Sequence, residues 1–348
     1  MKAINTMCIL ILIAAALLTA CSPDPIASAN AELEAGYTTA IADLMPAVLD
    51  SRPLRVVATT NIAVDVVAHI GGSAVELTAL LPIGADPHGY TPAPRDLQAV
   101  ADADVIFVSG FNLEEGLGDT LESVAGDVPI ISLSEGIQPR AFSLDTLPEA
   151  DVGDLHAAES SEDADHSHEG IDPHVWLDPT NVMQWAENAA RALSALDPER
   201  ASTFNTSASE YIAQLEALDT WILAELANLP ADARSLVTDH RALGYFADRY
   251  GLEIVGAVIP AYSSTASPSP QDLAALLAAI QAYEVSAIFV GVSVNPTLAE
   301  RVAEDSGIIL IPLYTGTLSR ADGPAATYIE MMEFDVNAIA GALAGGTE

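Results

Sequence analysis

Strand-like and helix-like segments alternate along most of this 348-residue chain. Short apolar runs such as Leu54–Ala58 and Val105–Ser109 are each followed by a stretch whose apolar residues have helical spacing. The same alternation resumes at Ser235–Thr238 and continues to the C-terminal region. Strands that alternate with helices form parallel sheets covered by helices. The sequence therefore predicts an α/β protein with two lobes, each containing a parallel sheet flanked by helices.

A long helix is expected between the lobes. After Pro198, the chain contains neither Pro nor Gly as far as Leu229. Its apolar residues recur at helical spacing: Phe204, Tyr211, Leu215, Leu218, Ile222 and Leu226. At about 1.5 Å per residue this segment would form one rigid helix of about 45 Å. We therefore predict an N-terminal lobe over residues 52–197, a connecting helix over 198–229 and a C-terminal lobe over 230–348.

The first residues have the pattern of an export signal. Lys2 precedes a short apolar run, Met7–Leu18, which is too short to span a bilayer. Leu18-Thr19-Ala20-Cys21 then matches a lipobox, with Cys21 as the residue that would carry lipid. The alternative is an ordinary signal peptide followed by a chance cysteine. We predict a lipoprotein signal peptide over residues 1–20, a tether over 21–51, and an extracytoplasmic protein anchored to the membrane through Cys21.

Charge and cysteine content narrow the function further. The chain has 49 acidic and 12 basic residues and a formal net charge of −37, which argues against a nucleic-acid partner. Its hydrophobic fraction of 50% argues against a disordered acidic protein. The two cysteines are Cys8, inside the signal, and Cys21. The mature chain would therefore have no internal disulfide and no catalytic thiol.

Three histidines have similar surroundings. His88 follows Asp-Pro after a predicted strand, His174 follows Asp-Pro at the end of an acidic loop, and His240 follows Thr-Asp after the first strand of the second lobe. Ligand sites in open α/β sheets form outside the carboxyl ends of strands, and neutral imidazole is the commonest metal ligand. Each histidine alone is compatible with an ordinary turn or surface position. Together they predict a metal site, with Asp86, Asp178 and Asp239 as candidate partners of the imidazoles.

The remaining histidines give weaker signals. Residues 151–170 form a low-complexity acidic loop, and we predict that it is either an accessory metal-collecting tract or a solvated linker. It carries His156, His166 and His168. His69 lies within a helical pattern next to Val66 and Val67, which favours a packed or surface position on a helix.

No catalytic motif supports an enzyme. The chain lacks a Gly-x-Ser-x-Gly elbow, a Walker loop and a His-Glu-x-x-His helix. A three-histidine site with an open fourth position can activate water, so a zinc-dependent hydrolase is the alternative from another class. We expect a binding protein.

From about Arg55 to its end, the chain resembles the cluster A-I solute-binding proteins of metal ABC importers, the zinc-uptake and adhesin-lipoprotein group. The Asp-Pro-His-x-Trp-x-Asp-Pro stretch is the most specific match. The matching segments are Val57–Ile62, Pro87–Leu97, Asp172–Pro179, Thr238–His240, Ala287–Val290 and Tyr328–Met332.

The resemblance implies that one metal ion is held between the lobes by His88, His174 and His240, and is passed to an ABC permease. Manganese-type members carry a carboxylate at the third position, so His240 indicates Zn²⁺; a Mn²⁺ or Fe²⁺ carrier is the alternative. We expect a monomer whose long helix limits lobe movement.

Two positions depart from the family pattern. Gly316 stands where an aspartate ligand often follows the last strand, and Gly291 stands where a glutamate is common. The fourth ligand is therefore unassigned, with water or a residue of the 151–170 loop as the options.

Overall fold

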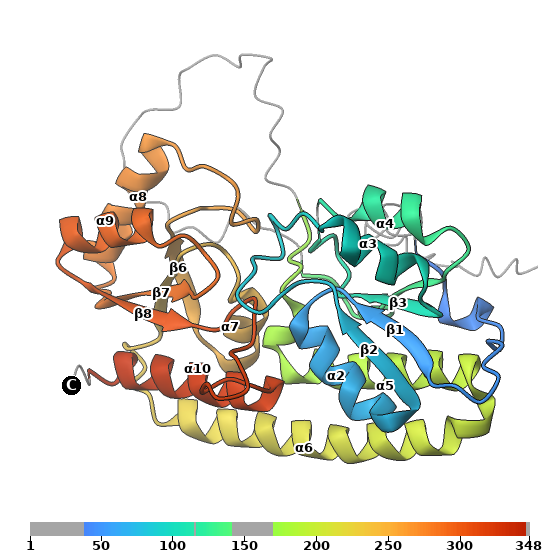
Figure 1. Ribbon diagram of the computed structural model, residues 1–348. Helices are drawn as coiled ribbons and strands as arrows, with labels where there is room; N and C mark the ends of the chain where they lie inside the picture. Colours follow the sequence, from blue (N-terminus) through green and yellow to red (C-terminus); the bar gives the residue numbers. More distant parts are fainter. Residues whose placement is uncertain (1–37, 115, 141–169, 346–348) are drawn as a thin grey trace, which may run out of the picture.

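The computed structural model describes residues 38–114, 116–140 and 170–345, and contains two four-stranded sheets (Figure 1). The strand order is β2-β1-β3-β4 in the N-terminal lobe and β6-β5-β7-β8 in the C-terminal lobe, and neighbouring strands pair in parallel. The predicted two-lobe α/β fold is confirmed. The strands are β1 (Leu54–Ala58), β2 (Val75–Ala79), β3 (Val105–Val108), β4 (Ile130–Ser132), β5 (Ser235–Thr238), β6 (Glu253–Ala257), β7 (Ala287–Gly291) and β8 (Ile309–Leu313).

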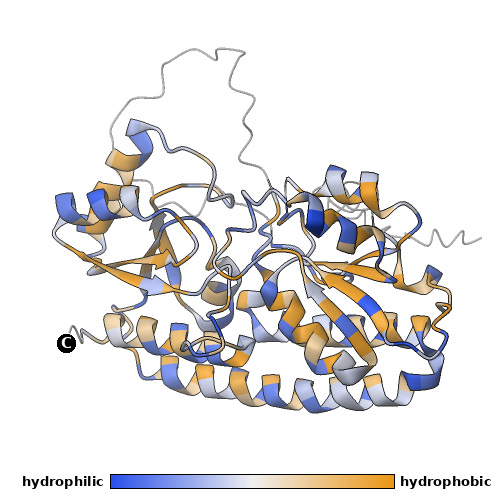
Figure 2. Ribbon diagram, viewed as in Figure 1, coloured by the Kyte–Doolittle hydropathy of each residue, from blue (hydrophilic) through white to orange (hydrophobic). Residues whose placement is uncertain are grey.

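Helices cover both sheets, and the central strands β3 and β7 are apolar throughout. Every residue of β3 and β7 is buried, as expected for parallel strands with both faces covered, and Figure 2 shows the strands largely in the hydrophobic colours. Buried residues of α3 and α4 pack on one face of the N-terminal sheet, and those of α2 and α5 on the other. The helices are α2 (Asn61–Gly71), α3 (Pro94–Ala101), α4 (Gly118–Ala125), α5 (Pro179–Leu196), α6 (Ala201–Ala227), α7 (Gly244–Tyr250), α8 (Pro270–Ala282), α9 (Thr297–Ser306) and α10 (Tyr328–Leu343), with short 3₁₀ turns η1 (Ile41–Asp43), η2 (Gly72–Ala74), η4 (Val175–Leu177) and η5 (Pro198–Arg200).

Helix α6 runs beneath both lobes (Figure 1). Its buried face contains the six apolar residues expected from the sequence. These residues join one core cluster that includes Phe107 of the N-terminal sheet and Phe289 of the C-terminal sheet. The lobes are therefore joined by a shared hydrophobic core as well as by a connecting segment.

Helix α5 is not predicted by the sequence pattern. Its N-cap is Asp178, whose Oδ1 accepts a hydrogen bond from the backbone of Thr180 (2.8 Å), and Pro179 occupies the first turn. Both are typical helix-start signals. We had considered Asp178 as a partner of a histidine, and the buried face of α5 is rich in alanine, which weakened its apolar pattern.

Helix α2 is capped by Thr60. The side chain of Thr60, and not that of Asn61, accepts the hydrogen bond from Ala63 N (3.1 Å). The Asn61 side chain instead contacts Thr317 and Leu318 of the other lobe.

Residues 38–51, which we predicted to form the end of a tether, pack against the N-terminal lobe. Thr39 N donates to Ile130 O (2.6 Å), Ala47 N donates to Leu196 O (2.9 Å), and Ile41 is buried in the core. The predicted signal peptide, the anchor Cys21 and the loop histidines His156, His166 and His168 lie outside the described residues. Within the described ranges, no helix has the length and apolar character needed to cross a membrane.

We predict that the buried face of α6 stabilises the protein strongly. Leu215→Ala, at a fully buried position, should lower the free energy of unfolding by about 2–5 kcal/mol because it leaves a cavity in the shared core. Leu223→Ala is the matched control, since Leu223 lies on the same helix and is 46% exposed. Denaturant titration measures both, and equal losses in the two variants would contradict the role given to this face.

Candidate metal centre

The three predicted histidines come from different parts of the fold and meet between the lobes. His88 lies in the connection between β2 and α3, His174 directly precedes η4, and His240 follows β5 by two residues. Their exposures are 5%, 1% and 3%. The structure thus brings together side chains that are 66 or more residues apart in sequence.

The three imidazoles point their Nε2 atoms at a common region. His174 Nε2 lies 3.2 Å from His88 Nε2 and 3.2 Å from His240 Nε2. In the described part of the chain, this is the one group of at least three histidine, cysteine or acidic residues whose candidate ligand atoms all lie within 4.8 Å of one another. The small cavity that the three histidines line has a volume of about 10 Å³, similar to the space needed for one water molecule.

Carboxylates orient two of the three rings. His174 Nδ1 lies 2.9 Å from Asp172 Oδ1, and His240 Nδ1 lies 2.8 Å from Asp239 Oδ1. A carboxylate at Nδ1 accepts its proton and leaves the Nε2 lone pair free to bind a metal ion. Asp239 was among the expected partners. Asp178 was the wrong candidate for His174, because it caps α5, and the actual partner, Asp172, lies two residues before the histidine.

His88 has a different environment. In the described part of the chain its Nδ1 has no hydrogen-bond partner, although the atom is buried. Asp86, the expected partner, accepts a hydrogen bond from the backbone N of His88 through Oδ1 (3.1 Å) and does not bind the ring. The orientation of His88 therefore depends on the loop that carries it.

Burial favours neutral imidazoles at two positions. The pKa of His174 is lowered well below 6.5 by burial and by His240, and the pKa of His88 is lowered by burial and by both neighbouring imidazoles. Neutral rings carry the lone pairs that metal ligation requires.

His240 and Asp239 form a buried charge-assisted pair. Burial opposes the charged form of His240, but the Asp239 carboxylate outweighs it and raises the pKa of His240 above 6.5. Burial likewise opposes the Asp239 charge, yet His240 and the hydrogen bonds from His240 N and Gly291 N lower the pKa of Asp239. Burial raises the pKa of Asp172 to about 7, against the effects of the His174 backbone and Arg140.

The two glycines that depart from the family pattern differ in the space around them. A Cβ on Gly316 would meet Pro87 and Ser293 no closer than 3.4 Å, which is ordinary contact. A Cβ on Gly291 would come within 2.5 Å of Thr315 Oγ1, so this position is crowded. Asp86 also lines the cavity. None of these residues identifies a fourth ligand.

His69 lies apart from the three-histidine group. It lies on α2, where its ring stacks on Tyr211 with the ring centroids 4.3 Å apart, and its Nδ1 is 2.8 Å from Asp65 O. This agrees with the packed helix position expected from its neighbours in sequence.

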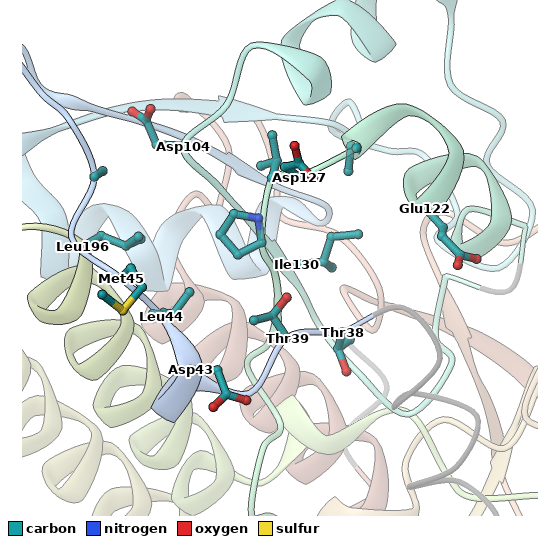
Figure 3. A pocket seen from close by; sticks show the side chains of 15 residues that line it. Thr38, Thr39, Asp43, Leu44, Met45, Asp104, Glu122, Asp127, Ile130 and Leu196 are labelled. Carbon is teal, nitrogen blue, oxygen red and sulfur yellow. The ribbon is translucent and has the colours of Figure 1, made fainter.

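A separate pocket lies in the N-terminal lobe, between residues 38–47 and the chain around β4 (Figure 3). It is lined by Leu44, Met45 and Ile130 among others, and by the carboxylates of Asp43 and Asp127. No histidine lines it. Imidazole chemistry thus favours the interlobe position as the metal centre.

Comparison with known proteins identifies the family. Residues 56–342 match the family model described as ZnuA, zinc-uptake complex component A, periplasmic. The manganese-binding lipoprotein MntA of Halalkalibacterium halodurans is 32% identical over 83% of this chain and 88% of its own length. The iron ABC transporter substrate-binding lipoprotein MtsA of Streptococcus pyogenes serotype M1 is 30% identical over 84% of this chain and 90% of its own length.

Solved structures agree with the fold. The periplasmic zinc-binding protein TroA of Treponema pallidum superposes with a TM-score of 0.71 and 28% identity, covering 84% of this chain and all of TroA. A cadmium-bound periplasmic metal-binding protein of Candidatus Liberibacter asiaticus gives a TM-score of 0.69 and 25% identity over 83% of this chain. The names of these relatives include different metals. The chain belongs to the ZnuA family of metal-binding proteins, the substrate-binding components of ABC metal importers.

Proposed function

We propose that this protein captures Zn²⁺ between its lobes and delivers it to the permease of an ABC importer. The observation that carries the proposal is the convergence of three buried imidazole Nε2 atoms, two of them oriented by carboxylates. Nitrogen-rich tetrahedral sites suit Zn²⁺, whereas Mn²⁺ prefers oxygen ligands. His88, His174 and His240 would supply three ligands, and the fourth position would be filled by water or by a residue of the 151–170 loop.

The protein acts outside the cytoplasmic membrane, held by a lipid on Cys21. The lipobox at residues 18–21 supports this location, as do MntA and MtsA, which are named as lipoproteins. A net charge of −37 would concentrate divalent cations near the surface without selecting among them. The monomeric state and the metal-collecting role of His156, His166 and His168 stay predictions.

A Mn²⁺ or Fe²⁺ carrier is the second candidate, because MntA and MtsA are named for these metals. The two candidates differ in their preferred ligands. Competition between Zn²⁺ and Mn²⁺ for the purified protein distinguishes them, and preference for Mn²⁺ at equal free concentrations would overturn the zinc assignment. The hydrolase alternative has no support from the family, whose members are binding components of importers.

Removal of a single imidazole should weaken zinc binding severely. Loss of a group that only orients a ligand typically costs 10–100-fold in affinity, so we expect His174→Ala and His240→Ala to cost at least about 100-fold. His69→Ala is the matched control, because this ring lies on α2 outside the group. Isothermal titration calorimetry, or titration in competition with a chelator, measures the zinc affinities. Wild-type affinity in His174→Ala would contradict the site.

Zinc affinity should fall as the pH decreases, because protons compete with the metal ion for imidazole. The pKa of His240 is raised, so this ring protonates first, and the decline should begin above pH 6.5. His88 and His174 have lowered pKa values and should gain protons at lower pH. Titrations between about pH 5 and 8 measure the slope. A constant affinity across this range would contradict neutral imidazole ligands.

A carboxylate at position 316 should shift the metal preference. Gly316→Asp introduces an oxygen ligand where a side chain has room, and we expect the affinity ratio of Mn²⁺ to Zn²⁺ to rise by about tenfold. Gly316→Asn, equal in size but uncharged, is the control. If both variants give the same ratio in competition titrations, position 316 does not contribute a metal ligand.

A further inference from the structure

His88 is the least constrained of the three proposed ligands. Asp172 and Asp239 hold the rings of His174 and His240, but within the described residues His88 Nδ1 has no such partner. The position of the His88 ring is therefore set by its loop, residues 80–93. What holds this loop determines how firmly His88 can bind a metal ion.

Two hydroxyl groups of the C-terminal lobe hold the His88 loop. Thr317 Oγ1 accepts a hydrogen bond from Gly84 N (2.8 Å). Ser264 Oγ donates to Asp86 Oδ2, and the other oxygen of Asp86 accepts from His88 N (3.1 Å). The Asp86 carboxylate thus links the Ser264 hydroxyl to the backbone of His88.

A residue of the N-terminal lobe also holds the Thr317 hydroxyl in place. It is buried, with the residue 1% exposed, and accepts a second hydrogen bond from Asn61 Nδ2 (3.0 Å). Asn61 Oδ1 in turn accepts from Leu318 N (2.6 Å). Loss of the Thr317 hydroxyl would leave donors from Asn61 and Gly84 without this acceptor.

Part of the loop reaches the surface, although its first residues, Leu80 and Leu81, are buried in the N-terminal core. Pro82, Ile83 and Gly84 are exposed, and Ser264 is half-buried. His174, by contrast, precedes η4, whose three residues are all buried. Exposed segments open more readily than core segments, so we expect His88, which follows the exposed residues 82–84, to leave the metal before His174 does.

We propose that Thr317 and Ser264 are positioning residues for His88, and that their hydroxyls slow the dissociation of bound metal by holding the 80–93 loop against the C-terminal lobe. This inference rests on the proposed function, because it assumes that His88 binds the ion. It assigns metal retention to hydrogen bonds between the lobes, outside the ligand set itself.

The test measures zinc dissociation from the purified protein after mixing with an excess of chelator. Thr317→Val removes the hydroxyl with little change in shape, and Ser264→Ala removes the contact with Asp86. Each should speed zinc dissociation by about tenfold, in line with the loss of a hydrogen bond near a buried site. Thr317→Ser, which keeps the hydroxyl, should behave like the wild type.

Thr327→Val is the matched control for a merely structural effect. The Thr327 hydroxyl caps α10 and accepts from Glu330 N (3.2 Å), so its loss should lower stability without changing zinc dissociation. Thermal unfolding of all variants separates the two effects. If Thr317→Val speeds dissociation no more than Thr327→Val does, the positioning role is contradicted.

A second comparison tests whether the hydroxyls act through His88. In a His88→Ala background, adding Thr317→Val should leave the zinc dissociation constant unchanged, because the ring that the loop positions is gone. A further loss of affinity in the double variant would overturn the proposal. If His88→Ala binds zinc like the wild type, the proposed ligand set is wrong. If His88→Ala weakens zinc binding but Thr317→Val and Ser264→Ala have no effect, only the positioning role is wrong.

Discussion

The hydrogen bonds from Asp172 to His174 and from Asp239 to His240 are the interactions on which the metal centre depends. Each carboxylate holds the Nδ1 side of a ring and so turns the Nε2 lone pair toward the same small cavity. Lone pairs from neutral rings 3.2 Å apart repel one another unless a proton or a cation lies between them. The arrangement is therefore one that a cation stabilises.

The three imidazoles and their two carboxylates are buried, so the structure around them must be rigid to keep them paired. Burial of charge is costly unless the charge is paired, and the site contains two carboxylates that are 0% and 3% exposed. The shared core along α6 and the hydrogen bonds that cross between the lobes, such as Trp176 Nε1 to Thr315 O (2.9 Å), supply this rigidity. Since both lobes pack on the same helix, we expect metal release through small loop movements to cost less free energy than release through rotation of whole lobes.

The sequence predicts the two-lobe α/β architecture and singles out the three histidines that the structure brings together, because short segments of the chain contain the signals for both. Alternating strands and helices are visible in single segments. Thr-Asp-His stands at the end of β5 and the second Asp-Pro-His directly precedes η4, whereas His88 lies inside the β2–α3 connection. The Asp172–His174 pair was also visible in principle, two residues apart. The missed helix α5 begins with a cap and a proline, but its alanine-rich face gave too weak an apolar pattern. Contacts such as Asn61 with Thr317 join residues more than 250 positions apart and have no local signal.

X-ray absorption at the zinc edge, on protein loaded with one equivalent of zinc, tests most directly whether three imidazoles hold a Zn²⁺ ion. We expect a four-coordinate ion with three imidazole ligands at about 2.0–2.1 Å and one further nitrogen or oxygen ligand. Fewer than three imidazoles around the ion, or failure of the protein to retain one equivalent of zinc, would contradict this expectation.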